Sequence, residues 1–305
     1  MRIRRSLILI AFGALLAFTF QMCRQKKAKV STDTFIHGTT HLLVDESFSP
    51  IVDEEAYVFK ALYPDAKPVL LYKTENEILN LLLNDSITFA IMSRDLSAAE
   101  VKIMEGHTLP PKTDKFAVDA VTLIVNQSSA DTTITVSALK DMLNGKSGTD
   151  RNIVFDNPNS SLARYLKELS GNKDLNGKNI YALKSNKEVI TYVSQHPQAI
   201  GITGFAWLND PDKDYADAVN KVKIVGVKDD TRKDDIGFTK PSQETLALKQ
   251  YPLIRSLYII DCSGREGLGT GFASFLLSDR GQRIILKSGL LPEVMPGREI
   301  NFIKQ

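Results

Sequence analysis

The sequence predicts an α/β fold of two lobes, each built on a mostly parallel sheet flanked by helices. Short segments rich in branched and apolar side chains alternate with amphipathic helical patterns along most of the chain. Such alternation is typical of parallel sheets covered by helices. The 305 residues, 43% of them hydrophobic, suffice for two lobes of roughly 100–150 residues each. Two polar stretches, His107–Lys115 and Lys228–Gln243, are expected to carry the chain between the lobes.

Branched and apolar content predicts the strands, and apolar spacing near the helical period predicts the helices. The strands are expected at Leu42–Val44, Val69–Tyr72, Phe89–Met92, Val118–Val125, Asn152–Phe155, Ile200–Thr203, Val222–Val227 and Leu257–Ile260. The helices are expected at Val52–Tyr63, Glu75–Leu83, Val136–Leu143, Ser161–Leu169, Lys187–His196, Thr270–Leu277 and Arg280–Ser288. The predicted division is a leader at 1–23, a flexible tether at 24–34, a first lobe at 35–115 plus 245–305, and a second lobe at 116–244.

The N-terminal segment has the pattern of an export signal. Three arginines precede the apolar run Leu7–Phe20, and Cys23 follows it. A basic start, a short apolar stretch and a terminal cysteine indicate a leader whose cysteine receives a lipid. The alternative is an uncleaved anchor helix, for which about 20 apolar residues are wanted. Both interpretations place the body outside the cytosol and hold it at a membrane.

The charge and the cysteine content indicate whether the chain can bind nucleic acid and whether it can form an internal disulfide. The formal net charge is +2 and the basic residues are scattered, so the chain lacks the basic stripe that nucleic acid requires. If Cys23 carries lipid, Cys262 has no partner for an internal disulfide. Because Cys262 follows an apolar strand, a buried and unreactive thiol is expected, with a reactive thiol as the alternative.

Four polar loops lie where a predicted strand meets a predicted helix. They are residues 45–50, 73–76, 93–97 and 156–161. Backbone N–H groups and the helix dipole attract anions at such junctions. Each loop supplies hydroxyl groups and the third adds the Arg94 guanidinium, which together suit a tetrahedral oxyanion. The alternative is that each loop only caps its helix.

Four segments in order resemble the phosphate-binding proteins of phosphate ABC importers. They begin with Phe89-Ala-Ile-Met-Ser-Arg-Asp-Leu-Ser, Ala199-Ile-Gly-Ile-Thr-Gly-Phe, Tyr251-Pro-Leu-Ile-Arg-Ser-Leu and Phe272-Ala-Ser-Phe-Leu-Leu-Ser. The resemblance extends from about Leu42 to Pro292. It implies a periplasmic-binding-protein-like fold of type II, in which two lobes joined by two hinge strands close on an anion. It also implies binding without covalent chemistry, hence no enzyme activity and no cofactor.

The resemblance implies a set of ligand-binding residues. They are Ser47, Phe48, Thr74, Ser93, Arg94, Ser160 and Ser161. The chain also departs from the family pattern. Asp156 and Pro158 stand where the family has an arginine and an acidic residue, and Glu75 stands in a turn that is usually rich in glycine. An acidic group repels a dianion unless it accepts the ligand's proton. Arg164 either replaces the missing arginine or is a solvated charge on a helix face.

Other motifs favour structural roles. His37 and His41 are four residues apart, but no third ligand has suitable spacing, so no metal site is predicted. His107 is isolated. The motif Gly267-Leu-Gly-Thr-Gly271 imitates a dinucleotide loop, yet too little chain follows for that fold. It is expected to open the last helices. No serine-hydrolase elbow is present.

These observations predict a monomeric, lipid-anchored, extracytoplasmic solute-binding protein. Its ligand is expected to be inorganic phosphate or a related oxyanion, and its partner the membrane permease of an ABC importer. The alternative is a binding-fold module of a cell-envelope complex whose anion pocket has degenerated, motivated by the altered loops.

Overall fold

The computed structural model describes residues 33–106, 111–146, 151–175, 177–234 and 236–297. The predicted leader with Cys23, most of the tether and His107 lie outside the described residues. Among the residues that are described, no helix combines the length and apolar content needed to cross a membrane.

Strands and helices alternate along the chain. The strands are β1 (Gly38–Asp45), β2 (Ala66–Lys73), β3 (Phe89–Met92), β4 (Lys112–Asn126), β5 (Thr133–Thr135), β6 (Asn152–Phe155), β7 (Ile180–Ala182), β8 (Ala199–Gly204), β9 (Val222–Ile224), β10 (Gly226–Lys228), β11 (Ile254–Asp261) and β12 (Leu291–Pro292). The helices are η1 (Glu46–Phe48), α2 (Ser49–Leu62), α3 (Glu75–Leu83), α4 (Ala98–Glu105), α5 (Val136–Leu143), α6 (Ser161–Ser170), α7 (Asn186–Gln195), α8 (Ala206–Asn209), α9 (Ala216–Val219), α10 (Gln243–Ala247), α11 (Leu268–Leu277) and α12 (Asp279–Lys287).

The main sheet has the strand order β2-β1-β3-β11-β4-β8-β6-β7. Pairing is parallel among β2, β1 and β3 at one end, and among β8, β6 and β7 at the other. Strands β11 and β4 lie between these groups and pair antiparallel with their neighbours. The sheet therefore consists of two parallel groups joined by two antiparallel strands.

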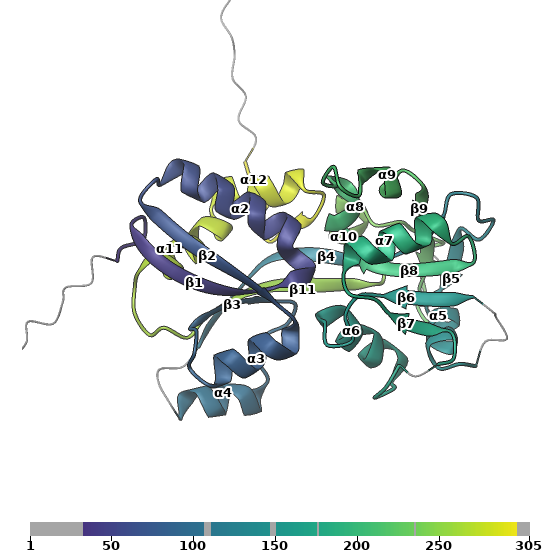
Figure 1. Cartoon of the computed structure of the whole chain (residues 1–305), viewed down its shortest axis with the longest axis horizontal. Coiled ribbons are helices and arrows are strands. Elements are labelled where there is room, and N and C mark those ends of the chain that lie inside the picture. Colours follow the sequence, from purple (N-terminus) through teal and green to yellow (C-terminus); the bar gives the residue numbers. More distant parts are fainter. Residues whose placement is uncertain (1–32, 107–110, 147–150, 176, 235, 298–305) are drawn as a thin grey trace, which may run out of the picture. The chain divides into compact units, whose positions relative to one another are not determined.

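The first lobe buries both faces of its parallel strands. Leu42 and Val44 of β1 face a core shared with α2, α11 and α12. Leu43, between them, faces a second core with α3 and α4. Because side chains alternate along a strand, one strand serves both cores. Figure 1 shows α2, α11 and α12 on one side of this sheet and α3 and α4 on the other.

The second lobe repeats the arrangement. Leu123 of β4 and Ile153 of β6 face a core with α5 and α6. Their neighbours Ile124 and Val154 face α7 and the indole of Trp207. In Figure 1, α7 lies on one side of these strands and α5 and α6 lie on the other. Both lobes therefore have the helix-sheet-helix layers of an α/β fold.

Two segments connect the lobes. Strand β4 pairs with β11 over its first half, up to Ala120, and with β8 from Val121 onward. The chain returns beside this point, where the Val121 amide donates to the carbonyl of Leu253 at 2.8 Å. Phe116 lies in the first core and Tyr251 in the second. The exact boundaries predicted for the lobes stay a prediction.

Every predicted strand and helix has a counterpart in the structure. The structure also contains elements that were not predicted, namely η1, α4, α8, α9, α10, β5, β7 and β12. Strand β4 begins at Lys112, six residues before the predicted strand Val118–Val125. The single strand predicted at Val222–Val227 is two strands, because β9 pairs with β4 whereas β10 pairs with β5.

The glycine motif at 267–271 opens α11, as predicted, and its glycines allow close packing. A Cβ on Gly269 would lie 2.2 Å from the Phe89 ring, and a Cβ on Gly271 would lie 2.0 Å from the Phe35 carbonyl oxygen. The motif therefore brings α11 against β3 and the N-terminal segment of the first lobe.

Candidate functional site

The first part of the site follows β1. The Asp45 side chain caps η1 by accepting a hydrogen bond from the Ser47 amide at 3.0 Å. Ser47 and the adjacent Phe48 are fully buried. The short polar turn at the end of a buried strand therefore directs the Ser47 hydroxyl toward the second lobe.

The second part follows β6. Ser160 is the N-cap of α6 and accepts from the Ala163 amide at 3.0 Å, while its hydroxyl donates to Asp156 Oδ1 at 2.5 Å. Asn186, at the start of α7, donates to Asp156 Oδ2 at 3.1 Å. Neighbouring hydroxyl and amide groups thus hold the Asp156 carboxyl in place.

The two parts contact each other across the cleft. The Ser47 hydroxyl lies 3.3 Å from Asp156 Oδ2 and 3.5 Å from the Ser161 hydroxyl. Trp207 Nε1 donates to the Ser47 carbonyl at 2.8 Å. Hydroxyls from the first and fourth predicted loops therefore meet in a buried group, here called the cleft cluster and composed of Ser47, Asp156, Ser160, Ser161 and Arg255.

Arg255 reaches the cleft cluster from the connecting strand β11. Its Nε and one terminal nitrogen donate to Asp119 Oδ2 at 3.0 and 2.9 Å, and the other terminal nitrogen donates to the Ser161 hydroxyl at 3.3 Å. The guanidinium lies over the Phe48 ring, 4.5 Å from its centroid. Phe48 is thus a packing surface for the buried cation.

Burial changes the acid–base behaviour of the cluster. Burial raises the pKa of Asp156 to about 7, while the Ser160 hydrogen bond and the Arg255 charge oppose this rise. The pKa of Asp45 is also raised, first by burial and then by the nearby Glu75 carboxylate. A neutral carboxyl donates a hydrogen bond, so Asp156 near neutral pH can serve an anion as a donor.

A second group lies one helical turn further along α6. Here Arg164 donates from Nε to Glu75 Oε1 at 2.5 Å and from a terminal nitrogen to the Ser93 hydroxyl at 2.8 Å. Arg94 lies beside them, with its Nε 3.6 Å from Glu75 Oε1. We call Glu75, Ser93, Arg94 and Arg164 the bridge cluster. Its members come from both lobes.

Thr74 has a different role. It is the N-cap of α3, accepts from the Glu77 amide and donates its hydroxyl to Glu77 Oε2 at 2.9 Å. This hydroxyl is used within a capping box.

The structure brings most of the predicted ligand-binding residues together in two groups. Ser47, Ser160 and Ser161 lie in the cleft cluster over Phe48, and Ser93 and Arg94 lie in the bridge cluster. Their contact with a ligand stays a prediction. The interpretation of Arg164 as a solvated charge is wrong, because it pairs with Glu75.

Asp119 and Arg255 were missed as site residues. Asp119 is the single charge in the mainly apolar segment 116–125 of β4, and Arg255 is the single charge in the mainly apolar segment 253–260. Charges in such strands are rarely buried unless they are paired, and this signal would have indicated a buried ion pair.

A family model described as a PBP superfamily domain matches residues 29–280. The chain belongs to the PBP superfamily. The phosphate-binding protein PstS of Borreliella burgdorferi is 28% identical over 261 residues, covering 80% of this chain and 86% of that protein.

Solved structures of other proteins have the same fold. A phosphate ABC transporter substrate-binding protein of Clostridium perfringens, with bound phosphate, has a TM-score of 0.69 at 21% identity, covering 84% of this chain and 99% of that one. An ABC-type phosphate transport receptor of Vibrio cholerae has a TM-score of 0.63 at 19% identity, covering 84% and 100%. These similarities confirm the predicted two-lobed α/β fold.

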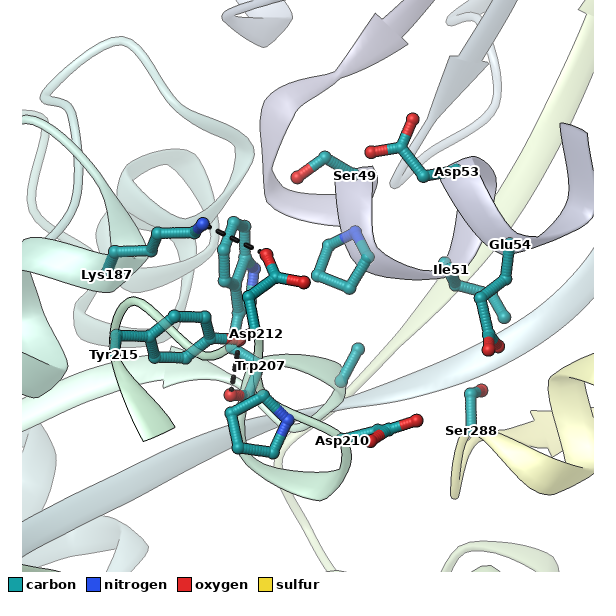
Figure 2. A pocket seen from close by; sticks show the side chains of 13 residues that line it. Ser49, Ile51, Asp53, Glu54, Lys187, Trp207, Asp210, Asp212, Tyr215 and Ser288 are labelled. Carbon is teal, nitrogen blue, oxygen red and sulfur yellow. Dashed lines mark hydrogen bonds and ion pairs between the residues drawn. The ribbon is translucent and has the colours of Figure 1, made fainter. Parts of the chain in front are cut away.

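A cavity of about 310 Å³ adjoins the cleft of this PBP-superfamily chain. Figure 2 shows Ser49, Asp53 and Glu54 of α2 on one side and Lys187 and Asp212 on the other. Lys187 is already paired with Asp212 at 3.0 Å. Four of the five charged residues in its wall are acidic, namely Asp53, Glu54, Asp210 and Asp212, so the charge of the wall repels an oxyanion.

Cys262 is buried, as predicted, and burial raises the pKa of its thiol to about 12. His37 Nδ1 lies 4.0 Å from an Asp65 oxygen. Within the described ranges, no group of three or more His, Cys, Asp or Glu residues is placed to hold a metal ion.

Proposed function

We propose that this chain is an extracytoplasmic solute-binding protein that captures phosphate or a related oxyanion for ABC-type import. The observation that carries the proposal is the cleft cluster. Hydroxyls of Ser47 and Ser160 converge from two lobes on Asp156. The Ser161 hydroxyl contacts Ser47 and accepts a hydrogen bond from Arg255. The similarity to PstS of Borreliella burgdorferi, named as a phosphate-binding protein, supports the choice of ligand.

Several features of the cleft cluster suit a protonated oxyanion. The N-terminus of α6 supplies a positive dipole end, and Arg255 supplies a charge-assisted donor. Asp156, with its raised pKa, either donates to an oxyanion or accepts the proton of one. The hydroxyls now contact each other directly, so we infer that the lobes open about the two connecting segments to admit the ligand.

The cellular setting is proposed from the leader. The lipid at Cys23 would hold the body at the membrane, close to the permease that receives the ligand. The protein would act there as a monomer and without covalent chemistry or a cofactor. Mass spectrometry of the mature N-terminus tests the anchor, because an intact Met1 would contradict lipidation.

Isothermal titration calorimetry of the folded chain with phosphate, arsenate and sulfate tests the ligand. We expect a measurable heat and a thermal shift with each of the three anions. Ser160→Ala and Arg255→Met should each weaken binding at least tenfold, about 1.4 kcal/mol. The absence of heat and of any thermal shift at millimolar anion would contradict the proposal.

A second candidate function is the envelope-complex module. It is favoured by the bridge cluster, in which the chain's own Glu75 pairs with Arg164 across the lobes. A folded chain that binds none of the three anions, but co-purifies with envelope proteins other than an importer, would support this alternative.

A further inference from the structure

The Glu75 carboxylate lies in a place that resembles an anion site. It is the first residue of α3, and its side chain is only 3% exposed. Oε1 lies 2.5 Å from Arg164 Nε, and Oε2 accepts from the Ser93 hydroxyl at 3.0 Å. Arg94 Nε lies 3.6 Å from Oε1. Two guanidinium groups and one hydroxyl therefore surround a single buried carboxylate.

These donors are the kind that oxyanions prefer, since charge-assisted bonds from guanidinium groups are strong and directional. They also come from different lobes, because Ser93 and Arg94 follow β3 whereas Arg164 lies on α6. An anion that satisfies them joins the two lobes.

We propose that the Glu75 carboxylate is a built-in anion that competes with the ligand and keeps the cleft closed when no ligand is bound. This regulation rests on the proposed capture of an oxyanion. A tethered group is present at a high effective concentration, so the contacts of Glu75 must break before the lobes open and a dissolved anion enters the cleft cluster. The apparent affinity for the ligand is lowered by the fraction of protein in the competent state.

The guanidinium groups of Arg164 and Arg94 each have a second carboxylate partner besides Glu75. Arg164 is also held by Glu168, with contacts of 2.8 and 2.9 Å, and Arg94 is held by Glu100 at the same distances. Removal of Glu75 therefore leaves both guanidinium groups positioned by Glu168 and Glu100 and frees only the donors that contact Glu75.

The first test measures phosphate affinity by calorimetry for the full chain and for Glu75→Ala. We expect Glu75→Ala to bind phosphate at least about tenfold more tightly than wild type. Glu105→Gln is the matched control, because it removes one negative charge from the exposed end of α4 and should leave affinity unchanged. If wild type binds phosphate, equal or weaker binding by Glu75→Ala would overturn the proposal.

Glu75→Gln guards against a folding defect, because it keeps an acceptor oxygen for Ser93 and Arg164. If Glu75→Ala does not fold, tighter binding by Glu75→Gln supports the proposal and unchanged or weaker binding refutes it.

The second test separates this proposal from the proposed function. Small-angle X-ray scattering without ligand should give a larger radius of gyration for Glu75→Ala than for wild type. Such opening supports the built-in anion even if neither protein binds phosphate, in which case only phosphate capture fails. An unchanged radius in the ligand-free Glu75→Ala protein refutes the closure role, whatever the affinity.

Discussion

At the scale of single residues, buried carboxyl groups set the properties of this protein. Asp156 receives hydrogen bonds from Ser160 and Asn186 and lies beside the Arg255 charge. Glu55 of α2 is the contrasting case. It is fully buried, and neither carboxyl oxygen has a hydrogen-bond partner among the described residues. A buried carboxyl group thus has hydrogen-bond partners in the cleft, whereas the buried carboxyl group of Glu55 in the first lobe has none among the described residues.

Glu55→Met should stabilise the fold at neutral pH. Burial raises the pKa of Glu55 to about 9 in the folded state, against 4.5 as its ordinary value. Between these values the unfolded chain is ionised and the folded chain is not, so stability falls as pH rises from about 4.5 to about 9. We expect a gain of about 3 kcal/mol at pH 7, measured by urea unfolding.

The pH dependence distinguishes this mechanism from a general packing effect. At pH 4 the ionisation penalty vanishes, so most of the gain of Glu55→Met should disappear. A gain of equal size at pH 4 and pH 7, or a loss at pH 7, would contradict the assigned role.

Asp119 should be essential for stability because it neutralises Arg255. Both side chains are at most 2% exposed, and the pair lies where the lobes connect. Removing one member of a buried pair leaves a charge without compensation, so Asp119→Ala should lower the free energy of unfolding by about 3–5 kcal/mol. The surface pair of Arg232 and Asp234 is the control, since Asp234→Ala should cost at most about 1 kcal/mol. Similar losses in both variants would contradict this assignment.

At the scale of elements, one junction between strand and helix serves two purposes. The predicted alternatives for these loops were helix capping and anion binding. Ser160 caps α6 and also donates to Asp156 in the cleft cluster, whereas Thr74 uses its hydroxyl within the cap of α3. Capping therefore does not exclude a residue from a site, because a hydroxyl accepts and donates at the same time.

The packing of α11 depends on its glycines. Gly271→Ala should lower the free energy of unfolding by about 1–3 kcal/mol, because the new Cβ would overlap the Phe35 backbone. Gly297→Ala is the matched control, since its Cβ would meet nothing within 4 Å. Chemical denaturation of both variants tests this, and a Gly271→Ala protein as stable as wild type would show that the N-terminal segment shifts without cost.

At the scale of the whole molecule, ligand binding should depend on the protonation of the cleft. With a pKa of about 7, Asp156 is mostly protonated at pH 6 and mostly ionised at pH 8. The ionised form repels an anion, so the affinity for sulfate, which does not itself titrate here, should fall by up to about tenfold per pH unit above pH 7.

Asp156→Asn isolates this effect. The amide cannot ionise, so its sulfate affinity should vary little between pH 6 and pH 8 while wild-type affinity falls. Calorimetry at several pH values compares the two proteins. If the sulfate affinity of Asp156→Asn declines as steeply as that of wild type, a group other than Asp156 titrates.

The local sequence pattern was enough to predict the longer elements and the family resemblance. Strands such as Phe89–Met92 and helices such as Glu75–Leu83 follow from local apolar patterns, which the chain carries without reference to distant residues. The polar loops at strand ends were predicted for the same reason. Short pieces such as β5 and β7 were missed, because their pairing depends on strands far away in the chain.

Which charges become partners depends on how distant parts of the chain fold together. Asp119 and Arg255 are 136 residues apart, and Glu75 and Arg164 are 89 apart. No spacing rule relates residues at such separations. The helical pattern around Arg164 therefore allowed the interpretation of a solvated charge, which is wrong. Burial, which raises the pKa of Asp156, likewise exists only after the lobes pack. The chain's local chemistry supplied the donors and carboxyl groups, and folding determined which of them became partners.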